Sequence, residues 1–323
     1  MKPTFHHKLV NGPYEDPVLY VRLFREKRAL MFDCGDITPL SLSQMLRVSD
    51  LFITHTHIDH FIGFDRILRS VLSRERPLRI FGPANIIDAV EGKLRGYSWN
   101  LIKGYPMELE VNAISGDMIK RAAFRAASGL IREEMESIPF DGTLLQEPSF
   151  RIRAVELDHE IPCLAYSLEE EFHINIIKTA LDNMGLMVGS WLRDLKQAIW
   201  ENRPGSSEIE TGGGIRRIDE LRKAARITDG QKLAYVTDAT PTKENIGKAA
   251  ELARGATSLY CEAFFMSHET ERALDRNHLT SAETAEIARR SGSRELIPMH
   301  YSSKYKGSDK DPGQEALELF MRE

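Results

Sequence analysis

Residues 54–60 read Thr54-His55-Thr56-His57-Ile58-Asp59-His60, and no other segment says as much about the fold. They follow the apolar run Leu51-Phe52-Ile53 and precede residues 61–68, whose apolar positions have helical spacing. Three imidazoles and one carboxylate within six residues are ligands suited to zinc or a similar metal. We therefore expect a metal site at the point where a buried strand passes into a helix.

The spacing within this motif predicts two neighbouring ions. His55 and His57 are two residues apart in a segment that we expect to be extended. Side chains at this spacing point to the same side, so the two imidazoles can share one ion. Asp59 and His60 lie beyond the turn, and we expect them to face a second ion nearby.

At these residues the chain resembles the metallo-β-lactamase superfamily, whose hallmark is His-x-His-x-Asp-His after a strand. The resemblance implies an α/β fold (α+β in some schemes), a four-layer αβ/βα sandwich with a dinuclear metal site at one sheet edge. Oxygen-reducing di-iron members usually have Glu where this chain has His57, so a hydrolase is implied. Asp33, in the turn Asp33-Cys34-Gly35, matches a position beneath the metal site. It either orients a metal-binding histidine or is an ordinary turn carboxylate.

Composition places the chain among soluble globular proteins, with 42% hydrophobic and 28% charged residues. A formal net charge of −5 provides no global basic field for nucleic acid, although a local basic patch is compatible with it. Cys34, Cys163 and Cys261 match no disulfide or metal spacing, so we expect reduced thiols and a cytoplasmic protein. The start has no apolar signal region, and no long apolar run follows, so we expect neither export nor a membrane span.

Apolar and β-branched runs alternate with helical patterns along most of the chain, and we expect one domain over 1–323. Strands are predicted at 18–24, 28–32, 78–81, 108–114, 150–157, 161–168, 232–238, 258–261 and 296–300. Helices are predicted at 85–94, 242–253 and 281–290. Between 115 and 149 we expect an apolar strand or helix and then a polar loop.

Residues 169–230 differ in character, and we expect an inserted arm there. Glu169-Glu170-Glu171 is interpreted as a solvated run, and helices are predicted near 174–184 and 191–200. Glycines 212–214 and the polar stretch 202–207 indicate a flexible loop. A group of cations follows, which we interpret as a solvated helix face, with phosphate contact as the alternative: Arg216, Arg217, Arg222, Lys223 and Arg226.

Polar residues end several of the predicted strands, and burying them at a sheet edge is costly unless they bind a metal or a partner. These residues are His55, His57, Asp59, His60, His159, Asp238, Glu262 and His300. The superfamily resemblance assigns His55, His57 and His159 to one ion. It assigns Asp59, His60 and His300 to the other, with Asp238 bridging both.

Glu262 and His278 narrow the resemblance to the ribonuclease Z branch, the tRNA 3′-processing endonucleases. The carrying motifs are Tyr235-Val236-Thr237-Asp238, Cys261-Glu262-Ala263-Phe264-Phe265, His278-Leu279-Thr280 and the closing segment 298–305. The resemblance implies that Glu262 orients His278 as the general acid and that Asp59 both ligates metal and accepts a proton. The chain departs from the branch at residues 10–14, where a Gly-Thr-Gly turn is absent, and at Cys261, which replaces a histidine.

The predicted function is therefore a two-metal phosphodiesterase of the ribonuclease Z type, acting on precursor tRNA as a homodimer. We expect two divalent ions, Zn²⁺ first, with Mn²⁺ or Fe²⁺ compatible with the same ligands. One alternative is a hydrolase of the same superfamily that acts on a small phosphodiester, a cyclic nucleotide or a thioester. The other is a metal-binding or RNA-binding protein without turnover.

Overall fold

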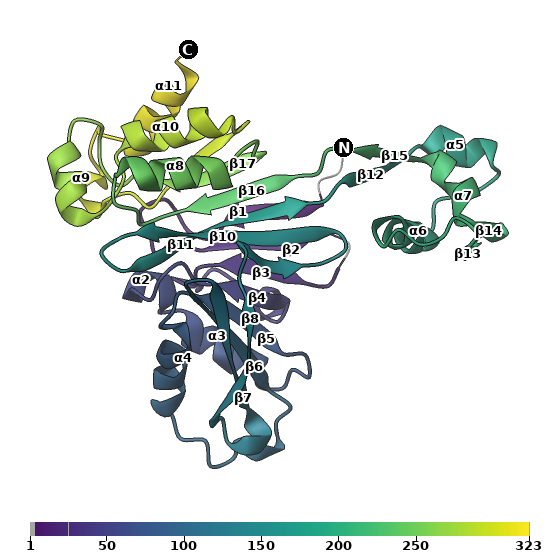
Figure 1. Ribbon diagram of the computed structural model, residues 1–323, viewed down its shortest axis with the longest axis horizontal. Helices are drawn as coiled ribbons and strands as arrows, with labels where there is room; N and C mark the ends of the chain where they lie inside the picture. Colours follow the sequence, from purple (N-terminus) through teal and green to yellow (C-terminus); the bar gives the residue numbers. More distant parts are fainter. Residues whose placement is uncertain (1–3, 25, 323) are drawn as a thin grey trace.

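Two β-sheets pack face to face, and helices cover the outer face of each, as the computed structural model shows for residues 4–24 and 26–322 (Figure 1). The first sheet has eight strands, in the order β1 (Phe5–Leu9), β2 (Leu19–Leu23), β3 (Ala29–Phe32), β4 (Val48–Phe52), β5 (Leu78–Gly82), β6 (Glu108–Ser115), β7 (Met118–Arg125) and β8 (Arg132–Pro139). The second has six, in the order β18 (Leu296–Met299), β17 (Ser258–Glu262), β16 (Lys232–Val236), β11 (Pro162–Glu170), β10 (Phe150–Asp158) and β9 (Thr143–Gln146).

The helices complete four layers. Those packed on the first sheet are α1 (Leu42–Met45), α3 (Phe64–Val71) and α4 (Ile86–Arg95). Those on the second are α8 (Lys243–Leu252), α10 (Ser281–Ser291) and α11 (Pro312–Met321). Short helices α2 (Ile58–Phe61) and α9 (Thr270–Arg276) lie at strand ends, and 3-10 turns occupy Ile102–Gly104, Ala126–Ser128 and Ser303–Tyr305. The predicted αβ/βα sandwich is confirmed.

A separate apolar core fills the space between the sheets. The register sets Phe32 beside Phe52 and Phe52 beside Phe81, and these rings stack at centroid distances of 5.0 Å. Tyr166 and Tyr235 of the second sheet are fully buried against them. This aromatic layer fixes one sheet relative to the other, which brings the strand ends of both sheets together.

Parallel pairing determines where those ends lie. In the first sheet β3 to β6 run parallel, and in the second β16, β17 and β18 do. The carboxyl ends of parallel strands meet at one edge, which is where open α/β sheets place their ligands. The loops after β3, β4, β16 and β18 carry Asp33, His55, Asp238 and His300, and Glu262 is the last residue of β17, so the fold gathers these residues at one place.

The prediction for 115–149 is wrong in its second half. This segment forms β7, β8 and β9 rather than an element followed by a polar loop. β8 is polar because it is the outermost strand of its sheet, where charged side chains such as Glu134 and Glu136 face solvent.

The arm is present and stands away from the two sheets (Figure 1). Its stalk is the antiparallel pair β12 (His173–Ile176) and β15 (Ala225–Thr228). Beyond the stalk lie α5 (Lys178–Asn183), α6 (Trp191–Trp200), the hairpin of β13 (Glu208–Thr211) and β14 (Gly214–Arg217), α7 (Ile218–Leu221) and the 3-10 turn Arg222–Ala224. They enclose an apolar cluster of their own, in which Trp191 is buried.

Three expectations for the arm need correction. The helix predicted from 174 starts only at Lys178, because 173–176 pair with β15. Gly212 and Gly213 form the tight turn of a hairpin whose second strand starts at Gly214, rather than a longer flexible loop. The five cations are exposed, as expected, but they lie on β14, β15 and the 3-10 turn, so they form no common helix face.

The acidic run at the root of the arm is solvated only at Glu171, and the prediction is wrong for the two residues before it. Glu169 and Glu170 are only 8% and 6% exposed. Glu169 binds Arg151 at 2.8 Å and Lys232 at 2.9 Å, and Glu170 accepts hydrogen bonds from Thr4 and from the backbone N–H of Gln231. Strand pairing supplies these partners, and a local sequence pattern cannot reveal them.

The expected single domain covers 1–323, of which 1–3, 25 and 323 lie outside the described residues. Within the described part, no helix is both long enough and apolar enough to cross a bilayer.

Candidate metal centre and active site

The loop after β4 presents the histidines of the motif. The chain leaves β4 after Phe52, and His57, which is extended with φ −63° and ψ 154°, is the residue before the first turn of α2. His55 and His57 therefore project to the same side, and their ring centroids are 4.4 Å apart. The chain then turns into α2, which carries Asp59 and the fully buried His60.

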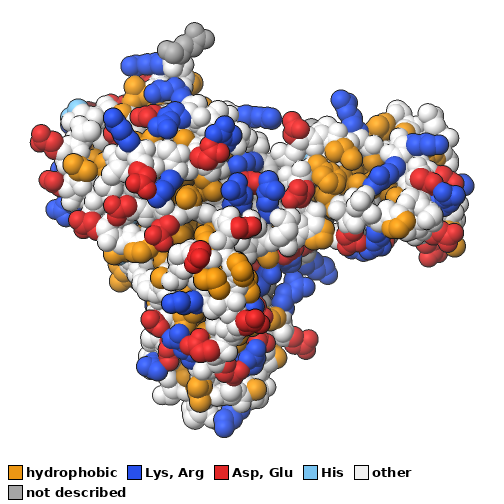
Figure 2. Space-filling view, viewed as in Figure 1, with side chains coloured by type: hydrophobic (Ala, Val, Ile, Leu, Met, Phe, Trp, Pro, Cys, Tyr) orange, Lys and Arg blue, Asp and Glu red, His pale blue; other side chains and the backbone are white. Residues whose placement is uncertain are grey.

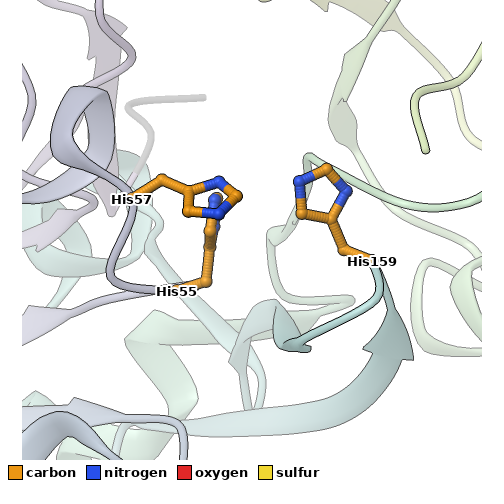
Figure 3. Close-up of side chains that lie close together, drawn as sticks. All are labelled: His55, His57 and His159. Carbon is orange, nitrogen blue, oxygen red and sulfur yellow. The ribbon is translucent and has the colours of Figure 1, made fainter. Parts of the chain in front are cut away.

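His159 completes a three-histidine group with His55 and His57. One ring nitrogen of each lies within 4.8 Å of the other two. His159 follows β10, so it reaches the group from the second sheet and faces the other two rings (Figure 3). Its Nδ1 donates a hydrogen bond of 2.8 Å to the carbonyl oxygen of Asn277, which leaves Nε2 with a free lone pair toward the group.

Asp59, His60 and His300 form a second group whose ligand atoms also lie within 4.8 Å of one another. Asp238 stands between the two groups. Its Oδ2 is 2.9 Å from His60 Nε2, and its Oδ1 is 3.8 Å from His159 Nε2. The structure therefore brings together all seven residues that the sequence predicts as metal ligands.

The unsatisfied atoms of this cluster support metal binding. The Nε2 atoms of His55 and His60 are buried and have no hydrogen-bond partner among the described residues, since His60 Nε2 does not meet Asp238 in hydrogen-bonding geometry. A buried polar atom without a partner is costly, and a divalent cation would satisfy both nitrogens. The donor set of imidazoles and carboxylates suits zinc, manganese or iron. The residues present therefore fit a divalent metal centre.

Burial and charge favour the ligand forms of two of these groups. Burial lowers the pKa of His55 to about 2, so its imidazole is neutral. Burial alone would raise the pKa of Asp238, but His300 and His60 outweigh it and hold that pKa well below its usual range. A neutral imidazole beside an ionised carboxylate is what a cation requires.

Asp33 supports the second group from below, as expected for one of its two interpretations. Its Oδ2 lies 2.8 Å from His60 Nδ1 and accepts from the Tyr235 hydroxyl at 3.0 Å. Its Oδ1 accepts from the Thr54 backbone N–H at 2.7 Å. Burial lowers the pKa of His60, but Asp238 and Asp33 raise it well above its usual value. The supporting roles of Thr54 and Tyr235 were not predicted, although both lie within the motifs quoted above.

Glu262 and His278 form the pair expected from the sequence. Glu262 Oε2 is 2.9 Å from His278 Nδ1, while Oε1 accepts from the backbone N–H groups of Ala239 and Leu279. Burial would raise the pKa of Glu262, but the contact with His278 lowers it to about 2. Because the carboxylate accepts at Nδ1, the other ring nitrogen, Nε2, is the one that can serve a bound substrate.

No protein-family model matches the chain. Among curated proteins, it is 29% identical to ribonuclease Z of Deinococcus radiodurans over 93% of this chain and 91% of that protein. It is 30% identical to ribonuclease BN of Cronobacter sakazakii over 86% of this chain and 80% of that protein. Among solved structures, a metallo-β-lactamase fold protein of Bacillus subtilis superposes with a TM-score of 0.55 at 14% identity, covering 97% of this chain and 92% of that one.

The structural match shows the fold, and the sequence matches extend over nearly the whole chain. The resemblance drawn from the motifs is thereby confirmed. This chain has the metallo-β-lactamase fold and belongs to the family of ribonuclease Z and ribonuclease BN.

Proposed function

We propose that the protein is a metal-dependent endoribonuclease that hydrolyses the phosphodiester joining a tRNA to its 3′ trailer. The observation that carries the proposal is the Glu262–His278 pair, held at 2.9 Å beside Asp238 and the two ligand groups. A ribose oxygen is a poor leaving group and needs a proton, whereas a thiolate leaves without one. A positioned acid next to a metal centre therefore supports phosphodiester hydrolysis over thioester hydrolysis.

In this proposal the site would hold two divalent ions, and Zn²⁺ is the ion that we expect first. His55, His57 and His159 would hold one, Asp59, His60 and His300 the other, and Asp238 would contact both. When bound, such ions supply Lewis acidity toward the phosphate and the attacking water.

The chain's own residues would move the protons. Hydrolysis forms one bond between water oxygen and phosphorus and breaks one phosphorus–oxygen ester bond. Asp59, whose side chain is 37% exposed at the site, would accept a proton from the water. His278 would deliver a proton from Nε2 to the departing oxygen, while Glu262 keeps Nδ1–H directed and stabilises the ring.

The arm supports RNA as the substrate. Basic and acidic side chains gather at the end of the arm farthest from the sheets (Figure 2), and the five cations of the arm are all exposed. Arg217 pairs with Asp219, and the remaining cations of the group face solvent. Each phosphate that such a cation contacts steepens the salt dependence of binding.

Neutralising the arm tests this part of the proposal. The variant replaces Arg216, Arg217, Arg222, Lys223 and Arg226 with glutamine. It should bind precursor tRNA more weakly and with a shallower salt dependence, yet hydrolyse a bis-aryl phosphodiester normally. A matched control replaces exposed cations of the body, Arg95, Arg254 and Arg290. Equal loss on both substrates would indicate that the arm serves the fold or a partner subunit instead.

Incubation with a precursor tRNA bearing a 3′ trailer, in zinc or manganese, tests the whole proposal. One cut at the trailer boundary, absent in His57→Ala and Asp238→Ala, is the expected result. Turnover of the bis-aryl phosphodiester alone would favour a small substrate. RNA binding without cleavage of either substrate would refute the proposal that the protein is an enzyme.

Three further expectations belong to the same proposal. We infer a homodimer, which the family resemblance implies and light scattering tests. A cytoplasmic location is supported by the three cysteines, which are all free and buried. The arm is taken as an insertion within one domain, so limited proteolysis at its stalk should leave the two-sheet body folded.

A further inference from the structure

We infer that Phe264 is a positioning residue for the general acid, a role that rests on the function proposed for His278. The Phe264 ring lies parallel to the His278 imidazole, with centroids 3.8 Å apart and planes inclined by 7°. The rings of His159 and His300 are near His278 too, but they are inclined to it by 63° and 66°. Phe264 thus covers one face of the imidazole as a flat stack.

The backbone holds the two rings in this arrangement. The N–H of Phe264 donates to the carbonyl oxygen of Leu279 at 3.0 Å, one residue beyond His278. Its carbonyl oxygen accepts from the N–H of Ser302 at 3.1 Å. The next residue, Phe265, forms a β-bridge with Thr280. The backbone of Phe264 is therefore joined directly to the segment that carries His278.

The stack supplies a constraint that Glu262 cannot. A hydrogen bond at Nδ1 sets the tautomer and anchors one corner of the ring, but the imidazole can still tilt about that bond. The parallel face of Phe264 opposes the tilt, because at a centroid distance of 3.8 Å the rings are in van der Waals contact and a tilt would press one edge of the imidazole into the phenyl ring. Together the two contacts fix the direction of Nε2.

This direction matters because an acid must lie within hydrogen-bond reach of the oxygen that it protonates. Small displacements of catalytic groups cost rate steeply. Leucine at 264 would keep much of the volume but lose the planar face. The loss should therefore appear only in the step that needs the proton.

The test compares two leaving groups in single-turnover reactions of the metal-loaded protein. Precursor tRNA loses a ribose oxygen, and bis(nitrophenyl) phosphate loses nitrophenolate, which leaves without help. Phe264→Leu should slow the first reaction about 3- to 10-fold, the worth of one aromatic pair, and leave the second nearly unchanged. Phe264→Tyr, which keeps the ring, should restore the wild-type ratio of the two rates.

A double-mutant cycle shows whether Phe264 acts through His278. In a His278→Ala background, Phe264→Leu should cause no further loss on tRNA. Phe265→Leu is the matched control, because this ring lies in the same apolar cluster but meets His278 edge-on at 6.3 Å. It should lower the melting temperature and change both rates by the same factor. If Phe264→Leu does not fold, Phe264→Met replaces it in the same cycle.

The outcomes separate this inference from the proposed function. Equal losses on both leaving groups, or a loss that adds to that of His278→Ala, would overturn the role of Phe264 alone. If wild-type protein cleaves neither substrate, or if His278→Ala itself shows no dependence on the leaving group, the proposed function falls and the inference with it.

Discussion

Replacing Asp33 with asparagine should weaken metal binding through the tautomer of His60. Asp33 has a φ of 55°, a left-handed conformation that asparagine adopts readily, so the backbone of the turn is not strained by the change. In the protein as it stands, Asp33 Oδ2 accepts from both His60 Nδ1 and the Tyr235 hydroxyl. An amide NH₂ at that position can only donate. His60 would then have to accept at Nδ1 and carry its proton on Nε2, the atom that faces Asp238 and the proposed ion.

The size of the effect follows from the contacts. Loss of the residue that hydrogen-bonds the outer ring nitrogen of a metal-binding histidine typically lowers metal affinity about 10- to 100-fold, or by about 1.4–2.7 kcal/mol. The metal-free protein loses two hydrogen bonds to a fully buried carboxylate, each worth about 1.5–3 kcal/mol. The tyrosine hydroxyl can rotate to accept from the new amide and recover part of that loss. We therefore expect the free energy of unfolding to fall by about 3 kcal/mol.

Urea unfolding of the metal-free protein measures the free energy of unfolding, and competition with a chromophoric chelator measures zinc affinity. Nitrogen-15 chemical shifts of the His60 ring report the tautomer directly. Asp36→Asn is the matched control, because Asp36 is an exposed carboxylate of the same turn that accepts from the Thr38 N–H. If Asp33→Asn loses stability but keeps wild-type zinc affinity and the wild-type tautomer, Asp33 serves the turn alone and this reasoning is wrong.

Three more predictions concern the metals, the acid and the root of the arm. Elemental analysis of protein purified without chelator should give two ions per chain and a reduced content in His57→Ala, whereas one ion or none in the wild type would contradict the two-ion site. His278→Ala should keep both ions yet slow tRNA cleavage by about 10²- to 10⁴-fold, with a smaller loss on a nitrophenyl ester. Burial raises the pKa of Glu169, but the ion pairs with Lys232 and Arg151 outweigh burial and bring the pKa below its usual value. The stabilisation by these ion pairs is therefore complete above about pH 4.3 and is lost as the pH falls through the lowered pKa. Glu169→Gln should therefore destabilise the protein by about 1–3 kcal/mol at pH 7 and by progressively less as the pH falls below about 4.3, and a difference that does not shrink in acid would exclude the ion pairs as its cause.

The local sequence pattern was sufficient to predict most strands and helices and to name the residues of the candidate site. The strands before Asp238 and His300 were predicted from short apolar runs, and the strand before His159 from the alternation of apolar and polar residues. Polar residues that terminate such runs stand out, and parallel strands bring their carboxyl ends to one edge. The metal roles of these residues stay predictions, but their proximity needed no information beyond the sequence and the family resemblance.

Contacts between distant segments were beyond the reach of those patterns. Glu169-Glu170-Glu171 has the composition of a solvated run, and only the pairing of β11 with β10 and β16 sets Arg151 and Lys232 against Glu169. Strand β8 shows no alternation of apolar and polar residues by which it could be predicted, because it is the outermost strand of its sheet and most of its side chains are not buried. The stack of Phe264 on His278 likewise depends on the bridge between Phe265 and Thr280. The spacing of apolar residues indicates which side of a segment is buried. Which residue of a distant segment it contacts is decided only when the strands pair and the sheets pack.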